Sequence, residues 1–178
     1  MDKILLDLRE LGDGVSRRVL EGEAASLALG RDDYTLHSPL RIVLDVDKSE
    51  GEIMVTGEVT VPAQVECGRC ACLFAEEVRG RLRARYIRTR GDAKPKCALS
   101  DDGVFEISRD ERVLDLTDEV RETVCLALPI RALCSPECRG LCPTCGANLN
   151  EEACCCERRQ GHPAWSALEK LKNGGRET

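Results

Sequence analysis

The chain has 178 residues, a formal net charge of −6 and 42% hydrophobic residues, with only two Phe, two Tyr and one Trp. This length fits one domain with an appendage or two small domains, and the negative charge argues against a protein that coats nucleic acid with its whole surface. The N-terminus carries acids from its second residue and no segment reaches bilayer-spanning length, which predicts a cytoplasmic protein with no membrane partner.

The first elements are short. Residues 3–11 place Ile4, Leu6 and Leu8 at a period of two, which predicts a strand. Gly12-Asp13-Gly14 ends it. Residues 15–29 fit either a strand at 16–22 or a short helix.

The clearest pattern is a long hairpin. Apolar residues alternate with polar ones over 40–46, a turn follows at 48–51, and the same alternation resumes over 53–67. One buried face is expected. Gly57 on that face suits a bend, and Pro62 indicates an edge strand or a bulge.

Cys67-Gly-Arg-Cys70 ends the hairpin's second arm. Two cysteines spaced by two residues in a strand–turn–strand setting favour a metal knuckle. The alternatives are a core cysteine at a turn and a redox-active pair. The redox alternative lacks the helix N-terminus that normally lowers the thiol pKa.

An arginine-rich strand comes next. Residues 79–96 contain eight positive residues and one acid, and four alternate arginines project from one face at a spacing of about 6.6 Å. This spacing is comparable to that of successive phosphates, so the strip is a candidate RNA contact; the alternative is a solvated outer face. Arg88 and Arg90 fall on the other phase, which predicts a bulge near Ile87. The four candidate residues are Arg79, Arg81, Arg83 and Arg85.

An acidic region follows a loop at 91–103 in which Cys97 has no obvious partner. Residues 101–122 hold nine acids, which we interpret as solvent-facing, and three arginines. A strand is expected at 104–107 and a helix at about 116–128, with acids in its first turn.

The cysteine-rich segment 134–156 holds seven of the twelve cysteines. Its densest part, Cys142-Pro-Thr-Cys145-Gly146, has the spacing of a zinc knuckle. A disulfide cluster or unpaired thiols are the alternatives, and a reducing cytoplasm disfavours the first.

Eight cysteines form four close pairs, enough for two tetrahedral zinc sites. One partition joins Cys142/Cys145 to Cys154/Cys156, and the distant pairs Cys67/Cys70 and Cys134/Cys138 to each other. The alternative is a single site in which Cys134/Cys138 join the knuckle and Cys67/Cys70 stay free. The eight candidate ligands are Cys67, Cys70, Cys134, Cys138, Cys142, Cys145, Cys154 and Cys156.

These elements predict an α+β protein: a twisted antiparallel sheet or partly closed barrel, a covering helix, and a C-terminal cysteine-rich zinc-binding segment. We expect a mainly β domain over 1–112. Residues 113–178 would add the helix, the knuckle segment and a short C-terminal helix from Pro163.

The sequence resembles the YceD-like large ribosomal RNA subunit accumulation proteins. The resemblance lies in LDLTDEVRETVCLALPI at 114–130, LCSPECRGLCPTCGANLN at 133–150, the closing ALEKLK at 167–172, and VECGRC at 65–70. Two departures are His162 before Pro163 and the additional Cys155.

The resemblance implies a non-enzymatic factor in 23S ribosomal RNA accumulation or processing and large-subunit assembly. Its partner would be ribosomal RNA or a ribosomal protein, and no catalytic constellation or small-molecule site is visible in the sequence. The alternatives are a thiol–disulfide oxidoreductase using Cys67 and Cys70, and a zinc-dependent protein-interaction adaptor.

Overall fold

A computed structural model describes residues 3–29, 34–89, 98–100 and 104–156 of the chain. The chain forms two compact units, residues 1–138 and 139–178. The predicted domain boundary at 112/113 stays a prediction. Cys97, Arg90, His162 and the helix expected from Pro163 lie outside the described residues.

A two-stranded ladder forms the centre of the first unit. β4 (Leu40–Ser49) and β5 (Glu52–Glu66) are antiparallel from Ser49↔Glu52 to Arg41↔Thr60, as the alternation predicts. The predicted apolar phase is almost completely buried, which confirms the hairpin and its inner face. Gly57 belongs to that face, and the position requires glycine because an added Cβ would clash with the Val43 carbonyl oxygen.

β6 (Leu73–Thr89) extends the ladder and is the longest strand. It pairs with β5 over fifteen positions, from Glu66↔Leu73 to Glu52↔Ile87. The pairing has no register shift, so the bulge predicted near Ile87 is wrong: the strand keeps its alternation, and Arg88 lies half-buried on the inner phase.

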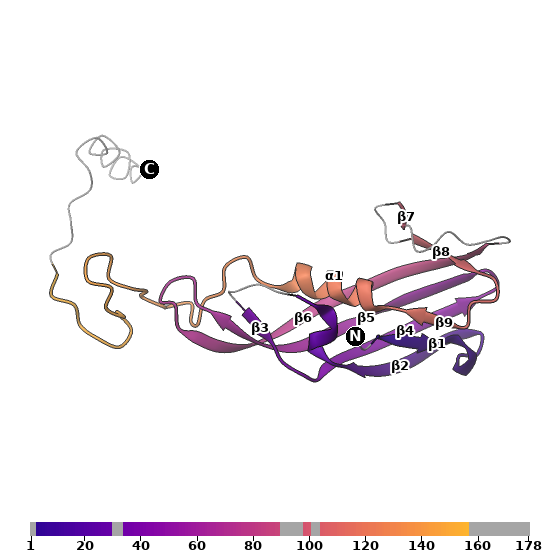
Figure 1. Cartoon of the computed structure of the whole chain (residues 1–178), viewed down its shortest axis with the longest axis horizontal. Helices are drawn as coiled ribbons and strands as arrows, with labels where there is room; N and C mark the ends of the chain where they lie inside the picture. The colour runs from indigo at the N-terminus through magenta and orange to yellow at the C-terminus, as the bar shows by residue number, and fades with distance from the viewer. Residues whose placement is uncertain (1–2, 30–33, 90–97, 101–103, 157–178) are drawn as a thin grey trace, which may run out of the picture. The chain divides into compact units, whose positions relative to one another are not determined.

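The other strands complete an open, twisted sheet (Figure 1). Its order is β2-β4-β5-β6-β8-β7, and β3 adds to β5 beyond the end of β4. Pro62 is therefore neither at an edge nor in a bulge; it lies where β5 changes partner from β4 to β3. The remaining bounds are β2 Gly14–Gly22, β3 Tyr34–Leu36, β7 Ala98–Ser100 and β8 Val104–Ser108.

Two details differ from the expected antiparallel sheet. β8 runs parallel to β6, because β7 comes between them in the chain and pairs antiparallel with β8 on its other side. β1 (Leu5–Asp7) is shorter than expected and pairs with β9 (Val113–Asp115) in a separate two-stranded sheet. Single-turn 3-10 helices follow at Leu8–Glu10 and Ala24–Leu27.

The helix α1 (Thr117–Ala127) covers the inner face of the sheet, as predicted (Figure 1). Val120 and Val124 enter the same core as the β4 and β5 side chains. No helix among the described residues is both long and apolar enough to cross a membrane.

We expected the acids of the helix to face solvent, and for one of them this expectation is wrong. Glu119 is only 7% exposed and accepts a hydrogen bond from the Tyr86 hydroxyl at 2.9 Å. Burial, followed by the nearby Glu119 carboxylate, raises the pKa of Tyr86 far above its ordinary value. The hydroxyl therefore stays a donor, and the pair joins α1 to β6.

Gly80 permits the close approach of α1 to β6. An added Cβ would lie 2.6 Å from Thr123 Cγ2 and 2.9 Å from the Thr123 carbonyl oxygen. We expect Gly80→Ala to lower the free energy of unfolding by about 1–3 kcal/mol because the helix must shift outward. Urea unfolding measures this change.

Gly12→Ala is the matched control, because nothing lies within 4 Å of a Cβ at that position. It should leave the stability unchanged or raise it slightly. Equal stability of the two variants would contradict the close packing at Gly80.

Candidate metal centres

The first cluster joins two distant parts of the first unit. Cys67 follows β5, Cys70 lies in the turn before β6, and Cys134 and Cys138 follow α1. Their four Sγ atoms lie within 4.8 Å of one another. Cys67 to Cys138 is 3.8 Å and Cys70 to Cys134 is 3.6 Å. Four thiolates around one zinc ion are about 3.8 Å apart, so the spacing of these sulfur atoms fits that ion.

Hydrogen bonds to main-chain carbonyl oxygens hold the two segments together. The Gly68 N–H donates to the Ala132 carbonyl oxygen at 2.8 Å. The Arg69 guanidinium donates to the carbonyl oxygens of Cys138 at 2.8 Å and Pro136 at 3.3 Å. The two residues between Cys67 and Cys70 thus fix the segment that carries the other two thiols.

The turn at Cys67 has the form of a metal knuckle. The Ala71 N–H donates to the Cys67 carbonyl oxygen at 2.9 Å, and the Cys67 N–H to the Cys72 carbonyl oxygen at 2.9 Å. Ala71 has φ +56°, a left-handed conformation that glycine normally takes. The turn therefore points both thiols of the pair to one side.

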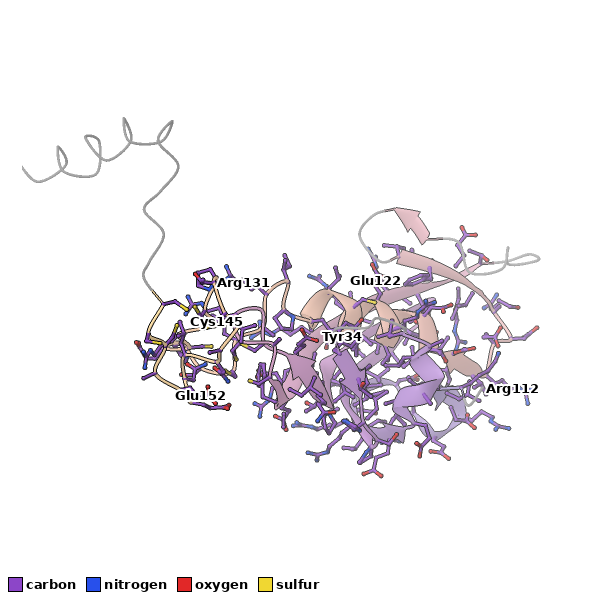
Figure 2. The ribbon with its side chains drawn as sticks, turned by 60° about the vertical axis from the view of Figure 1, so that its left-hand side comes forward. Tyr34, Arg112, Glu122, Arg131, Cys145 and Glu152 are labelled. Atoms are coloured by element: carbon purple, nitrogen blue, oxygen red, sulfur yellow. The ribbon has the colours of Figure 1, made fainter. Side chains whose placement is uncertain are left out.

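The second cluster lies within the second unit, where sulfur atoms gather beside Cys145 (Figure 2). The Sγ atoms of Cys142, Cys145, Cys154 and Cys156 are within 4.8 Å of one another. Cys154 Sγ is 3.3 Å from that of Cys142 and 3.5 Å from that of Cys145. Such distances are too long for a disulfide, whose sulfurs are about 2.05 Å apart.

The second knuckle repeats the bonds of the first. The Gly146 N–H donates to the Cys142 carbonyl oxygen at 2.9 Å, and the Cys142 N–H to the Ala147 carbonyl oxygen at 2.8 Å. Gly146, with φ +76°, corresponds to Ala71. The sequence indicates this turn through its glycine, but gives no such signal at Ala71.

An asparagine network supports the second knuckle, and sequence reasoning missed it. The Arg139 N–H donates to Asn150 Oδ1 at 2.7 Å, and Asn148 Oδ1 accepts from the Asn150 N–H at 3.1 Å. Asn148 also bridges to Leu141, next to the first ligand of the knuckle. The Asn148 and Asn150 side chains and this backbone bridge thus fold the loop back on itself, where few apolar side chains are buried among the described residues of the unit.

Backbone donors stabilise one thiolate in each cluster. The Cys134 N–H, 3.4 Å from Cys67 Sγ, is the largest of several effects that lower the pKa of Cys67 to about 5. The N–H groups of Cys145 and Thr144 lower the pKa of Cys142 to about 6. In contrast, burial raises the pKa of Cys134. Thiolates are the form that binds zinc.

The sequence does not indicate that Cys72 belongs near the first cluster. Its Sγ is 3.2 Å from Cys70 Sγ, although it is not in the set of four. Cys125 and Cys155 are exposed, and the structure brings neither into a cluster. The eight clustered thiols divide between the two units as in the two-site partition.

The predicted arginine strip lies on the outer face of β6, and all four side chains are exposed. Arg85 donates to Glu52 at 2.6 and 2.9 Å, and Arg79 forms an ion pair with Glu77. Among the described residues, Arg81 and Arg83 have no ion pair. The strip is therefore partly neutralised, and only its middle presents free guanidinium groups.

The family model and the named relatives point to the same family. Residues 55–172 match the model of the family described as large ribosomal RNA subunit accumulation protein YceD. An uncharacterized protein of Mycobacterium tuberculosis is 31% identical over 195 residues, which cover 95% of this chain and 90% of the relative. No solved structure matches.

Two plant relatives carry the family name. The chloroplastic large ribosomal RNA subunit accumulation protein YCED homolog 1 of Zea mays is 29% identical over 148 residues, covering 68% of this chain and 50% of the relative. Its Arabidopsis thaliana counterpart is 24% identical over 191 residues, covering 94% and 59%.

The left-handed backbone at Ala71 predicts a specific order of stabilities. Ala71 is exposed, so its side chain contributes little packing. We expect Ala71→Gly to be tolerated and Ala71→Val to lower the free energy of unfolding by about 1–2 kcal/mol, because a branched side chain opposes positive φ. Thermal and urea unfolding of the variants test this.

Ala75→Val is the control, at an exposed position of extended backbone in β6. It should cost nothing because valine favours strands. Equal losses from valine at both positions would contradict the knuckle conformation.

Proposed function

This chain belongs to the YceD family of large ribosomal RNA subunit accumulation proteins, and on that premise we propose that it acts as a non-enzymatic factor in 23S ribosomal RNA accumulation and large-subunit assembly. The observation that carries the proposal is the family match, which spans both cysteine clusters and the arginine strip. Depletion of the protein in its own cells should lower large-subunit RNA relative to small-subunit RNA. Unchanged proportions would overturn the proposal.

The partner that we favour is RNA, bound locally on the outer face of β6. The net charge of −6 disfavours wrapping by the whole surface. Arg81 and Arg83 lie two residues apart on β6, where its pairing with β5 is unbroken, and both are exposed and without ion pairs among the described residues. Free guanidinium groups in this arrangement suit two phosphates.

Each cluster is proposed to hold one structural zinc ion. Four thiolates at tetrahedral spacing are the donor set that zinc prefers, and a closed set leaves no position for a substrate. The first ion would join the β5–β6 turn to the segment after α1. The second would stabilise residues 139–156, where few apolar side chains are buried among the described residues.

Two other functions receive less support. A thiol oxidoreductase needs an accessible nucleophile, whereas Cys67 and Cys70 are 1% and 5% exposed. An adaptor would dock a basic ribosomal protein on the acidic region 101–122. Two acids of that region are not freely available to such a partner, because Glu119 is buried in the core and Asp115 forms an ion pair with Lys3.

The zinc proposal predicts two ions per purified chain. Changing Cys67 and Cys70 together to Ser should remove one ion and leave the other, because the clusters share no ligand. Elemental analysis against protein concentration gives the stoichiometry. Cys125→Ser, at an exposed thiol outside both clusters, should retain both ions.

Chelation should also destabilise the structure. Removing zinc leaves four thiols crowded in each cluster, so the free energy of unfolding should fall by several kcal/mol.

For the stoichiometry, a single zinc ion per wild-type chain that is still bound in the Cys67/Cys70 double variant would contradict the two-site assignment.

The RNA proposal predicts a difference between paired and unpaired arginines. Arg81→Ser with Arg83→Ser should weaken binding of single-stranded RNA and reduce the slope of log affinity against log salt by about 1.4, the value for two phosphates. Fluorescence anisotropy at several salt concentrations measures both.

Arg79→Ser with Arg85→Ser is the matched pair on the same strand, and its guanidinium groups already contact Glu77 and Glu52. It should change the slope much less. Equal slopes for the wild type and the Arg81/Arg83 variant would identify the strip as a solvated face. Retention of ribosomal protein after ribonuclease treatment would then favour the protein partner.

A further inference from the structure

A polar pocket of about 550 Å³ opens at the end of the sheet where β4 turns into β5. Residues 48–51, from the end of β4 through the turn, form one wall. Arg88 at the end of β6 forms another, and Arg109 after β8 a third. Asp13, between β1 and β2, also lines it. All of these residues belong to the first unit, and none belongs to a cysteine cluster or to the arginine strip.

Arg88 is held in the pocket and has no counter-ion among the described residues. Its backbone N–H donates to the Gly51 carbonyl oxygen at 2.8 Å, and Nη1 donates to the Arg109 carbonyl oxygen at 3.3 Å. Its Nε is buried and has no hydrogen-bond partner. Within the described part of the chain it makes no ion pair. A half-buried guanidinium without an anion is costly, so the site favours an anionic ligand.

Lys48 and Arg109 add positive charge at the same pocket. The Lys48 ammonium donates to the carbonyl oxygens of Leu11 at 2.9 Å and Leu8 at 3.3 Å, which fixes it and leaves its third donor for a ligand. Arg109 is exposed, and its guanidinium has no hydrogen bond or ion pair among the described residues. Three cations from three separate chain segments therefore meet here.

Two exposed carboxylates, Asp13 and Glu50, also line the pocket. Neither lies within ion-pair distance of the three cations, so they do not neutralise them directly. A ligand that suits the whole pocket has an anionic group for the cations and hydroxyl donors for the carboxylates. A phosphate attached to a ribose has both.

We propose that this pocket binds the phosphate and ribose of a ribonucleotide unit, supplied either by an RNA chain or by a free nucleotide. For the RNA source the inference rests on the proposed function and would give RNA a second contact, at the far end of β6 from the cysteine cluster. Arg109 would bind phosphate through paired donors, Arg88 would add positive charge and its remaining donors, and Asp13 or Glu50 would accept from ribose hydroxyls.

The test uses the full metal-loaded chain and two probes: 5′-AMP, followed by NMR or calorimetry, and a short single-stranded RNA, followed by anisotropy. Arg88→Met and Arg109→Ser remove one cation each, and the second lies at an exposed position where folding should be unaffected. Arg112→Ser is the control, because Arg112 is exposed, three residues from Arg109 and outside the pocket. 5′-dAMP tests recognition of the 2′-hydroxyl.

We expect each pocket variant to weaken binding of at least one probe by about tenfold, with Arg112→Ser near wild type. Weaker binding of 5′-AMP alone assigns the pocket to a free nucleotide, and weaker binding of RNA alone assigns it to an RNA chain. No binding of either probe, or equal losses in Arg112→Ser, overturns the pocket. If the pocket variants weaken binding but the Arg81/Arg83 variant does not change RNA binding, the inference stands and the arginine strip is no longer part of the proposed function.

Discussion

The uninterrupted pairing of β5 with β6 is the constraint on which the other features depend. Fifteen paired positions keep one alternation along the whole ladder. At about 3.3 Å per residue the fifteen residues of β5 span about 46 Å. The ladder therefore places Cys67 and Cys70 at one end and Arg88 at the other. It also directs Arg81 and Arg83 outward and Leu82 and Ala84 into the core.

The helix and the first cysteine cluster both depend on this ladder. α1 packs on β6 at Gly80, so the chain leaves the helix beside the sheet end that carries Cys67. The Gly68 and Arg69 hydrogen bonds then align residues 132–138 with the turn. Four thiols from segments more than sixty residues apart converge because the helix and the sheet have already positioned both segments. A metal bound there would close a long loop and so constrain the unfolded chain.

The second cluster follows a different physical principle. Its ligands lie within 15 residues, and short hydrogen bonds from Asn148, Asn150 and the Gly146 turn shape the loop. Local geometry is enough to gather these thiols, whereas the first cluster requires the folded sheet. The same knuckle turn thus meets a distant pair of cysteines in the first cluster and a nearby pair in the second.

The sequence by itself determined the hairpin, its buried face, the helix, the arginine strip and the four cysteine pairs, because each is a local pattern with a fixed period or spacing. Its errors came from long-range contacts. Tertiary structure decided that β8 runs parallel to β6, that β1 pairs with β9, and that Glu119 is buried beside Tyr86. It also decided which cysteine pairs meet and gathered Lys48, Arg88 and Arg109 at one pocket. Residues from separate strands become neighbours only through strand order and register, and no local pattern of the chain records these.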